Sequence, residues 1–198
     1  MGFITLKPGT MLAPTPVVMV TCASETAAPN IITLAWVGTV CSEPPMLSVS
    51  VRPHRHSYEI IRDSGEFAVN LVSRDLVKAT DLCGVKSGRD GDKFALCGLT
   101  PLPLEELRFA PGIAESPAVL ACRVEREVPL GSHSMFVAHI VGVHVRDDLA
   151  DEGGKVDFGR AGLVAYSHGE YAGLSRPLGF FGFSVARPEI LRRRMGKK

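Results

Sequence analysis

The stretch NIITLAWVGTVCSEPPMLSVSVRPHRHSYEII, residues 30–61, decides the fold more than any other part of the chain. Residues 30–40 are mostly apolar and rich in β-branched side chains, which predicts a buried strand. Pro44 and Pro45 cannot continue a central strand, so we expect Ser42-Glu43-Pro44-Pro45 to form a turn. This stretch therefore predicts a strand, a tight turn and a second strand.

The residues after this turn alternate in polarity, as in a strand with one buried face. One face would carry three apolar side chains, and the other two hydroxyls and a guanidinium. These are Leu47, Val49 and Val51 on the first face, and Ser48, Ser50 and Arg52 on the second. Two small hydroxyls leave room for a ligand against the strand, whereas long charged side chains are more usual on a bare surface. A ligand-facing strand is the preferred interpretation, and a solvent-facing strand is the alternative.

Basic residues follow this strand and lead into a short helix. We expect Ser57 to cap a helix over residues 57–64, which Gly65 closes. Arginine can hold phosphate through two parallel N–H donors, and a helix N-terminus offers free backbone N–H groups. Arg52, Arg55 and Ser57 are therefore the candidate phosphate ligands. His56 lies beside them, and a plain surface histidine is its alternative.

The remaining sequence predicts further strands and few helices. Residues 17–21 and 67–72 are typical of strands, and residues 118–128 and 135–145 of two long strands joined by a hairpin connection. A helix is expected over residues 73–83, with Ser73 as its N-cap and Gly84 as its stop. Residues 158–184 are rich in glycines and aromatics and show no pattern that assigns regular structure. Many short strands favour a closed antiparallel barrel, which removes exposed strand edges.

The bulk properties indicate one domain over residues 1–198, with residues 158–198 as an extension of it. With a formal net charge of +1, the 198-residue chain carries no global field for nucleic acid. No apolar run approaches the ~20 residues that span a bilayer, and no secretory signal pattern opens the chain. We therefore expect a cytoplasmic protein without nucleic-acid or membrane partners. The basic residues 191–198 are interpreted as a solvated tail, with binding of an anionic partner as the lesser alternative.

The five cysteines and six histidines show no CxxC pair or metal-ligand spacing, so neither a disulfide framework nor a metal site is expected. The chain also lacks GxGxxG, GxSxG and HExxH motifs. A separate dinucleotide-binding domain is therefore not predicted.

In the order and spacing of its motifs, the chain resembles the flavin reductase-like family of FMN-binding split barrels, and in particular its flavoredoxin-like members. The resemblance rests on residues 30–36, 42–45, 48–53, 55–57, 66–70, 83–88 and 92–94. It is good over residues 10–145 and weaker beyond. It implies a mainly β fold: an antiparallel, Greek-key-like split barrel with a few peripheral helices. It also implies a homodimer that binds one noncovalent FMN per subunit.

The resemblance further implies which residues meet the flavin. Residues 33–36 would face the isoalloxazine ring through main-chain groups, although a plain core strand is the alternative. Residues 83–93 would approach the flavin, with a solvated basic loop as the alternative, and His133 would be either a flavin neighbour or a turn residue. The full set of expected FMN contacts is Thr33, Leu34, Ala35, Trp36, Ser48, Val49, Ser50, Val51, Arg52, Arg55, His56, Ser57, Cys83, Gly84, Ser87, Lys93 and His133.

The cofactor carries the redox chemistry in such proteins, so no catalytic side chain is expected. The first hypothesis is an NAD(P)H-dependent flavin reductase, in which hydride passes to flavin N5 from a nicotinamide docked over the ring. The second is a flavoredoxin-like electron carrier reduced by a partner protein without NAD(P)H. The third is a flavin-free barrel that shares only the scaffold.

Overall fold

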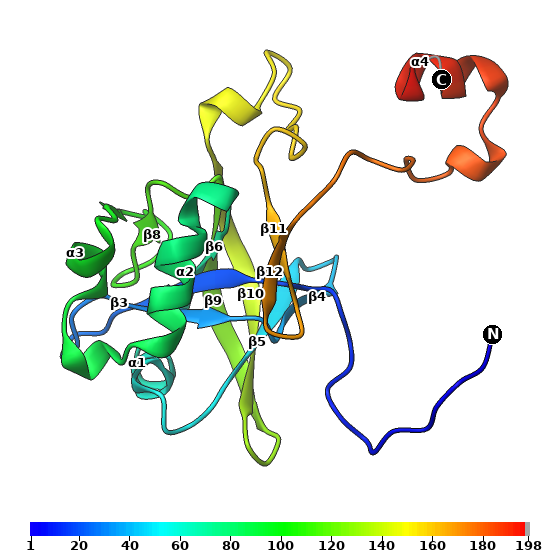
Figure 1. Ribbon diagram of the computed structural model, residues 1–198. Helices are drawn as coiled ribbons and strands as arrows, with labels where there is room; N and C mark the ends of the chain where they lie inside the picture. The colour runs from blue at the N-terminus through cyan, green and yellow to red at the C-terminus, as the bar shows by residue number, and fades with distance from the viewer. Residues whose placement is uncertain (197–198) are drawn as a thin grey trace.

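A computed structural model describes residues 1–196 and is built around one antiparallel sheet. Its seven strands lie in the order β3-β2-β6-β9-β10-β5-β4. They are β2 (Val18–Cys22), β3 (Asn30–Leu34), β4 (Val37–Cys41), β5 (Met46–Val51), β6 (Glu66–Leu71), β9 (Ala118–Pro129) and β10 (Ser134–Val145). The sheet curls on itself, with peripheral helices on one side (Figure 1). The prediction of a mainly β split barrel with few helices is confirmed.

The prediction of one strand over residues 30–40 was wrong, because the chain leaves the sheet at Ala35 and Trp36. β3 pairs with β2, whereas β4 pairs with β5, so these consecutive strands form opposite edges of the sheet. The backbone N–H of Ser50 donates to the carbonyl of Trp36 over 2.9 Å, which ties the crossing to β5. The crossing residues therefore bridge the opening between the two edges of the half-barrel.

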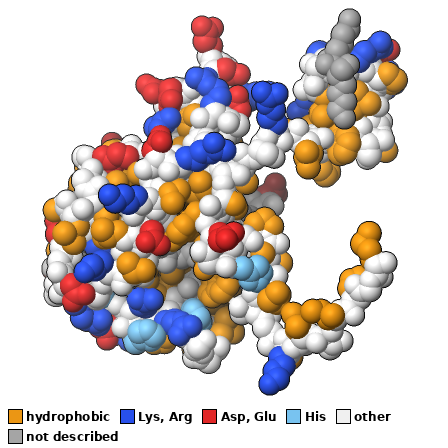
Figure 2. Space-filling model, in the orientation of Figure 1, with side chains coloured by type: hydrophobic (Ala, Val, Ile, Leu, Met, Phe, Trp, Pro, Cys, Tyr) orange, Lys and Arg blue, Asp and Glu red, His pale blue; other side chains and the backbone are white. Residues whose placement is uncertain are grey.

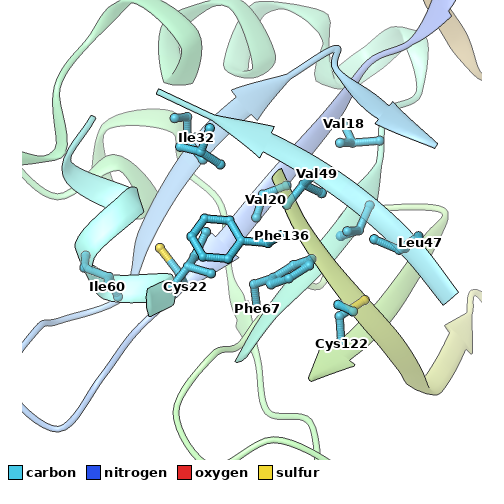
Figure 3. Close-up of a cluster of buried hydrophobic side chains, with 14 residues drawn as sticks. Val18, Val20, Cys22, Ile32, Leu47, Val49, Ile60, Phe67, Cys122 and Phe136 are labelled. Atoms are coloured by element: carbon cyan, nitrogen blue, oxygen red, sulfur yellow. The ribbon is translucent and has the colours of Figure 1, made fainter. Parts of the chain in front are cut away.

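The core fills the concave side of the sheet. Leu47, Val49 and Val51 point inward at 3%, 0% and 0% exposure, as their alternation predicted. Figure 3 shows this cluster, in which Phe67 and Phe136 lie among aliphatic side chains from several strands. Burying one such side chain contributes roughly 1.5–3 kcal/mol. The opposite face of β5 is therefore free to line a cavity while its inner face anchors the strand.

Helix α1 (His56–Ser64) follows β5, but Ser57 is not its N-cap as predicted. Arg55 holds that position. The Ser57 hydroxyl is buried and accepts a hydrogen bond of 2.8 Å from Nδ2 of Asn30, so it is committed to β3. Gly65 ends the helix in the left-handed conformation, with φ 68°, as predicted.

Helix α2 (Val77–Val85) begins after the 3-10 turn η1 (Arg74–Leu76). Ser73 is the N-cap of this turn and not of α2, so the predicted helix start holds only for the turn. Gly84 lies inside the last turn of α2 and does not end the helix. A Cβ at Gly84 would lie 3.3 Å from Cβ of Thr33, so this glycine lets the helix pack closely on β3. The 3-10 turn η2 (Gly88–Asp90) and helix α3 (Lys93–Cys97) follow.

The segment left unassigned by the sequence contains a hairpin. β11 (Val164–Ser167) and β12 (Glu170–Gly173) pair with each other, and β1 (Thr15–Pro16) pairs with β11. The hairpin turns at His168 and Gly169, both with positive φ, at 45° and 94°. β7 (Pro101–Leu102) and β8 (Gly112–Ile113) pair with each other in a separate two-stranded sheet, and both precede β9 in the chain. The 3-10 turn η3 (Asp147–Leu149) follows β10.

Both ends of the chain extend away from the barrel (Figure 1). Beyond β12 the chain runs to η4 (Phe183–Val185) and helix α4 (Pro188–Met195), so most of the expected basic tail is helical. Lys197 and Lys198 lie outside the described residues. No helix over residues 1–196 is long and apolar enough to cross a membrane.

Candidate functional site

Two adjoining cavities lie where β3 crosses to β4. The large lobe encloses about 740 Å³ and the small lobe about 230 Å³. Ile32, Arg55 and Gly84 line both lobes, so the two lie side by side against the same residues. The two lobes differ in the charge and polarity of the side chains that line them.

The small lobe is a cationic cup at the N-terminus of α1. Among the described residues, its lining includes no aspartate or glutamate. Its basic side chains are His54, Arg55, His56, Lys86, Arg89 and Lys93. The pKa of His56 is lowered, first by partial burial and then by the nearby charges of Arg89 and Lys93. A phosphate group matches both this charge and the free N–H groups of the helix end.

Lys93 is the buried cation of this lobe, at 3% exposure. Its Nζ donates to the carbonyl of Ile31 at 2.7 Å and to that of Cys83 at 2.9 Å. The ion pairs found within residues 1–196 do not include Lys93. Burial lowers the pKa of Lys93, and the Arg55 guanidinium lowers it further. A buried ammonium without a carboxylate partner is costly, so a bound anion would stabilise it.

The floor of the small lobe is built by close packing against β3. Asn30 donates to Ser57 from one side, and Gly88 approaches it from the other. A Cβ on Gly88 would collide with the side chain of Asn30 and approach the ring of His56. Gly88 therefore allows the basic segment 86–89 to fold over the lobe, a feature that sequence reasoning did not identify.

The large lobe is shaped by the strand crossing and by more distant segments. The crossing contributes Thr33, Leu34, Ala35 and Trp36, and Trp36 keeps 38% of its surface exposed. The hydroxyl of Thr33 donates to the carbonyl of Thr80, so it is not free for a ligand. A flat ring could therefore lie against main-chain groups of the crossing, whose carbonyls and N–H groups suit a heteroaromatic edge.

Polar side chains border the large lobe on the other sides. Arg52 and His133 lie on one border, and burial lowers the pKa of His133, with Arg52 adding to the effect. The hydroxyl of Tyr171 donates to Oδ1 of Asp81 over 3.2 Å. Burial and this carboxylate raise the pKa of Tyr171 to about 12. This tyrosine therefore stays protonated over the physiological range and fixes the hairpin to α2.

Most of the expected FMN contacts line one lobe or the other. Three do not: Ser48, Val49 and Val51. The side chains of Val49 and Val51 are fully buried in the core, because they belong to the inward face of β5. Ser48 lies on the outward face but further along the strand, opposite Val137 of β10. The other members remain predicted contacts, now gathered around one pocket.

Sequence reasoning missed the lining that comes from the N-terminal segment and from the β11–β12 hairpin. These residues are Thr10, Leu12, Thr15, Val17, Tyr166, His168, Gly169 and Tyr171, together with Asp81 and Val85 of α2. One local signal was available, because Gly169 between two aromatic residues suits a tight turn that requires positive φ. Nothing local indicates that this hairpin lies against the strand crossing.

Known proteins share the sequence pattern and the fold of this chain. The model of the family described as "Flavin reductase like domain" matches residues 10–175. The chain belongs to the flavin reductase-like family. The expected resemblance is confirmed, and a flavin oxidoreductase is the class of protein that this membership supports.

Structures and sequences of relatives agree with this assignment. Flavoredoxin of Desulfovibrio vulgaris (Miyazaki F) is 29% identical, with a TM-score of 0.86 over 93% of this chain and 100% of its own. Flavoredoxin from Methanosarcina acetivorans is 27% identical, with a TM-score of 0.85 over 94% of this chain and 100% of its own. The reductase component of a 4-nitrophenol 4-monooxygenase/4-nitrocatechol 2-monooxygenase from Rhodococcus opacus is 27% identical over 124 residues, which are 63% of each chain.

Proposed function

We propose that this protein binds one FMN noncovalently, with the phosphate in the small lobe and the ring in the large lobe. The observation that carries this proposal is the buried ammonium of Lys93 in a cationic lobe without a carboxylate among its described lining residues. A single phosphate monoester carries about −1.5 to −2 charge at neutral pH, which suits one compact cationic cup. The adjoining large lobe of about 740 Å³ is wide enough for a flat three-ring system.

The residues of the pocket would hold the cofactor and leave the chemistry to it. When bound, the flavin supplies the electron-transfer chemistry. Lys93 and Arg55 would neutralise the phosphate, and the first N–H groups of α1 would add hydrogen bonds. The main chain of the crossing would orient the ring, and Trp36 would shield it from solvent. No side chain is assigned as a catalytic acid or base.

We favour an NAD(P)H-dependent flavin reductase as the activity. The relative in Rhodococcus opacus is named as a reductase component, which supports this class. The large lobe is open to solvent on one side, which leaves access for a second planar ring. Lys86 and Arg89 lie at the exposed border of the small lobe, where they could hold the phosphates of a donor. A donor held by so few contacts should bind weakly, with a Michaelis constant near the upper end of the usual ~1 μM to 1 mM range.

The second candidate is an electron carrier that a partner protein reduces. Both flavoredoxin structures align along their full lengths with TM-scores of 0.86 and 0.85, which favours this reading. Anaerobic stopped-flow mixing of the FMN-loaded protein with rising NADH or NADPH separates the two. Bleaching of the flavin band by either nucleotide supports the reductase. Bleaching by dithionite alone rejects it and supports the carrier.

We further propose that the protein works as a homodimer. The two arms that leave the barrel carry exposed apolar side chains, and apolar atoms gather on the C-terminal segment in Figure 2. Phe3, Leu12, Leu178, Phe181 and Val185 are all more than half exposed. Such a surface is costly in water and is typical of association sites. Light scattering during gel filtration tests this, and a monomeric mass at micromolar concentration would reject it.

A further inference from the structure

Two cysteine sulfurs meet beneath the small lobe. Sγ of Cys83, in α2, lies 3.7 Å from Sγ of Cys97, in α3, across a separation of 14 residues. The other cysteines have a different environment. The sulfurs of Cys22, Cys41 and Cys122 lie against backbone oxygens of Asn30, Glu43 and Leu120. Among the five free cysteines, this pair alone has its sulfurs in contact.

The two thiols of the pair differ in access. Cys83 is 1% exposed and packs in the core beside Phe94, and burial together with the neighbouring Cys97 raises its pKa to about 12. Cys97 is half-buried at the end of α3, next to Gly98, which has a left-handed φ of 63°. Because access limits thiol reactivity, Cys97 is the sulfur that an oxidant reaches first. Cys83 is then placed to react with the oxidised product.

We propose that Cys83 and Cys97 form a reversible disulfide when hydrogen peroxide oxidises the protein, and that this bond restrains the basic segment that closes the small lobe. In the first step the Cys97 sulfur attacks peroxide, the O–O bond breaks, and sulfenic acid and one water form. In the second step the Cys83 sulfur displaces the sulfenic hydroxyl, giving the S–S bond and a second water. Two thiols are oxidised by two electrons, and one peroxide is reduced to two waters.

The bond would act on the small lobe because the two cysteines bracket its basic wall. Residues 86–92 lie between α2 and α3 and carry Lys86, Ser87, Gly88 and Arg89 into that lobe. The carbonyl of Cys83 also accepts from the ammonium of Lys93 at 2.9 Å. The two sulfurs, 3.7 Å apart, must approach to about 2.05 Å for a bond, so the cross-link draws α2 and α3 together. Cross-linking the ends of a segment removes open conformations from it.

Peptide mapping of the full-length protein tests the bond itself. After treatment with hydrogen peroxide and alkylation of free thiols, trypsin should release peptides 79–86 and 94–108 as one disulfide-linked species. The Cys41→Ser variant should give the same species, since that sulfur has no sulfur neighbour. The Cys97→Ser variant should give none, and dithiothreitol should abolish it in the wild type. Sulfinic acid at Cys97 without the linked species, or a link to another cysteine, would overturn the proposal.

Amide hydrogen exchange tests the consequence for the segment. In the oxidised protein, exchange of residues 84–92 should slow by roughly tenfold to a hundredfold relative to the reduced protein, the range that closing a loop of this length allows. Cys97→Ser should show no change on the same treatment. Equal exchange in both redox states would refute the restraint even if the disulfide forms.

The consequence for FMN rests on the proposed function, and its readout is kept separate. Oxidation should slow FMN release by at least a few-fold in wild type and not in Cys97→Ser. If the linked peptides and slowed exchange are seen but FMN does not bind, the proposed function fails and the cysteine pair stands. If FMN binds but the linked peptides are absent, the cysteine pair fails and the proposed function stands.

Discussion

The small and large lobes of the pocket are assembled in different ways. The small lobe is lined by residues from three short stretches, 30–32, 54–57 and 83–93, and its character is electrostatic. The large lobe takes its lining from the N-terminal arm, the strand crossing, β5 and the residues after it, α2, the β9–β10 connection and the β11–β12 hairpin, and it is mixed in polarity. A few short stretches of sequence can therefore supply a phosphate-binding lobe, whereas a ring-binding surface depends on how distant segments pack together.

This contrast separates the ligands FMN and riboflavin, which share the ring and differ by the phosphate. Substitutions in the small lobe should weaken FMN and leave riboflavin almost unchanged. Substitutions of ring-facing residues in the large lobe, such as Trp36, should weaken both ligands equally. The affinity of every variant is therefore measured for both FMN and riboflavin.

Lys93→Met should have the largest effect. Methionine keeps an unbranched side chain that is only one atom shorter, but it removes the ammonium that would face the phosphate. Removing one partner of a buried charge pair costs about 2–5 kcal/mol, so FMN affinity should fall by roughly 30-fold or more. Fluorescence titration of the apoprotein measures this. Lys86→Met, an exposed lysine of the same lobe, is the matched control and should lose far less. Equal losses for riboflavin would show that Lys93 supports the fold and not the phosphate.

Arg55→Ala should weaken FMN by about tenfold, and Arg52→Ala by less. A charge-assisted hydrogen bond contributes about 1.5–3 kcal/mol, and the exposure of both guanidiniums places them at the lower end. Arg55 lines both lobes, whereas Arg52 lines only the large one. Isothermal titration of each variant with FMN checks the order. The reverse order would place the phosphate at the Arg52 border and contradict the division between the lobes.

Trp36→Ala should weaken FMN and riboflavin by the same factor. The indole lies at the strand crossing, where it would contact the ring and not the phosphate. An aromatic pair contributes about 0.5–1.5 kcal/mol, so both affinities should fall by roughly two- to twelvefold. A thermal midpoint close to that of the wild type would show that the fold is intact. A loss specific to FMN would be evidence against the assignment of the ring to the large lobe.

The ratio of FMN to riboflavin affinity should fall as pH rises toward the alkaline range. Burial and Arg55 lower the pKa of Lys93 from its ordinary value of 10.5, so the free protein loses this proton before the FMN complex does. Between these two pKa values, binding takes up a proton, so FMN affinity falls with pH by less than tenfold per pH unit. Riboflavin corrects for titration of the ring itself. A ratio that stays flat in the wild type, or that still falls in Lys93→Met, would be inconsistent with this assignment.

Local patterns predicted the parts of the fold that local physics determines. The alternation from Leu47 to Arg52 predicted β5 and its two faces, and Gly65 predicted the end of α1. The break at Ala35 and Trp36 was missed because neither glycine nor proline marks it, and both of its flanks favour strands. The cap at Ser57 was predicted wrongly because the hydroxyl is used by Asn30, a partner 27 residues away.

The same distinction holds for the candidate site. Arg55 and His56 could be predicted because basic side chains near a helix start indicate an anion, whereas Lys93 was indicated only by the family resemblance. Thr10, Tyr166 and His168 could not, since their position depends on β1 pairing with β11 across most of the chain. The contact between Cys83 and Cys97 was also invisible, because the angle between two short helices is set by core packing and not by spacing.

A crystal structure of the protein grown with FMN would locate both ends of the cofactor. We expect the phosphate in the small lobe, within hydrogen-bond distance of Lys93 Nζ and Arg55, and the ring against the main chain of Ala35 and Trp36. Phosphate oxygens in the large lobe or in solvent, with the small lobe filled only by water, would contradict it.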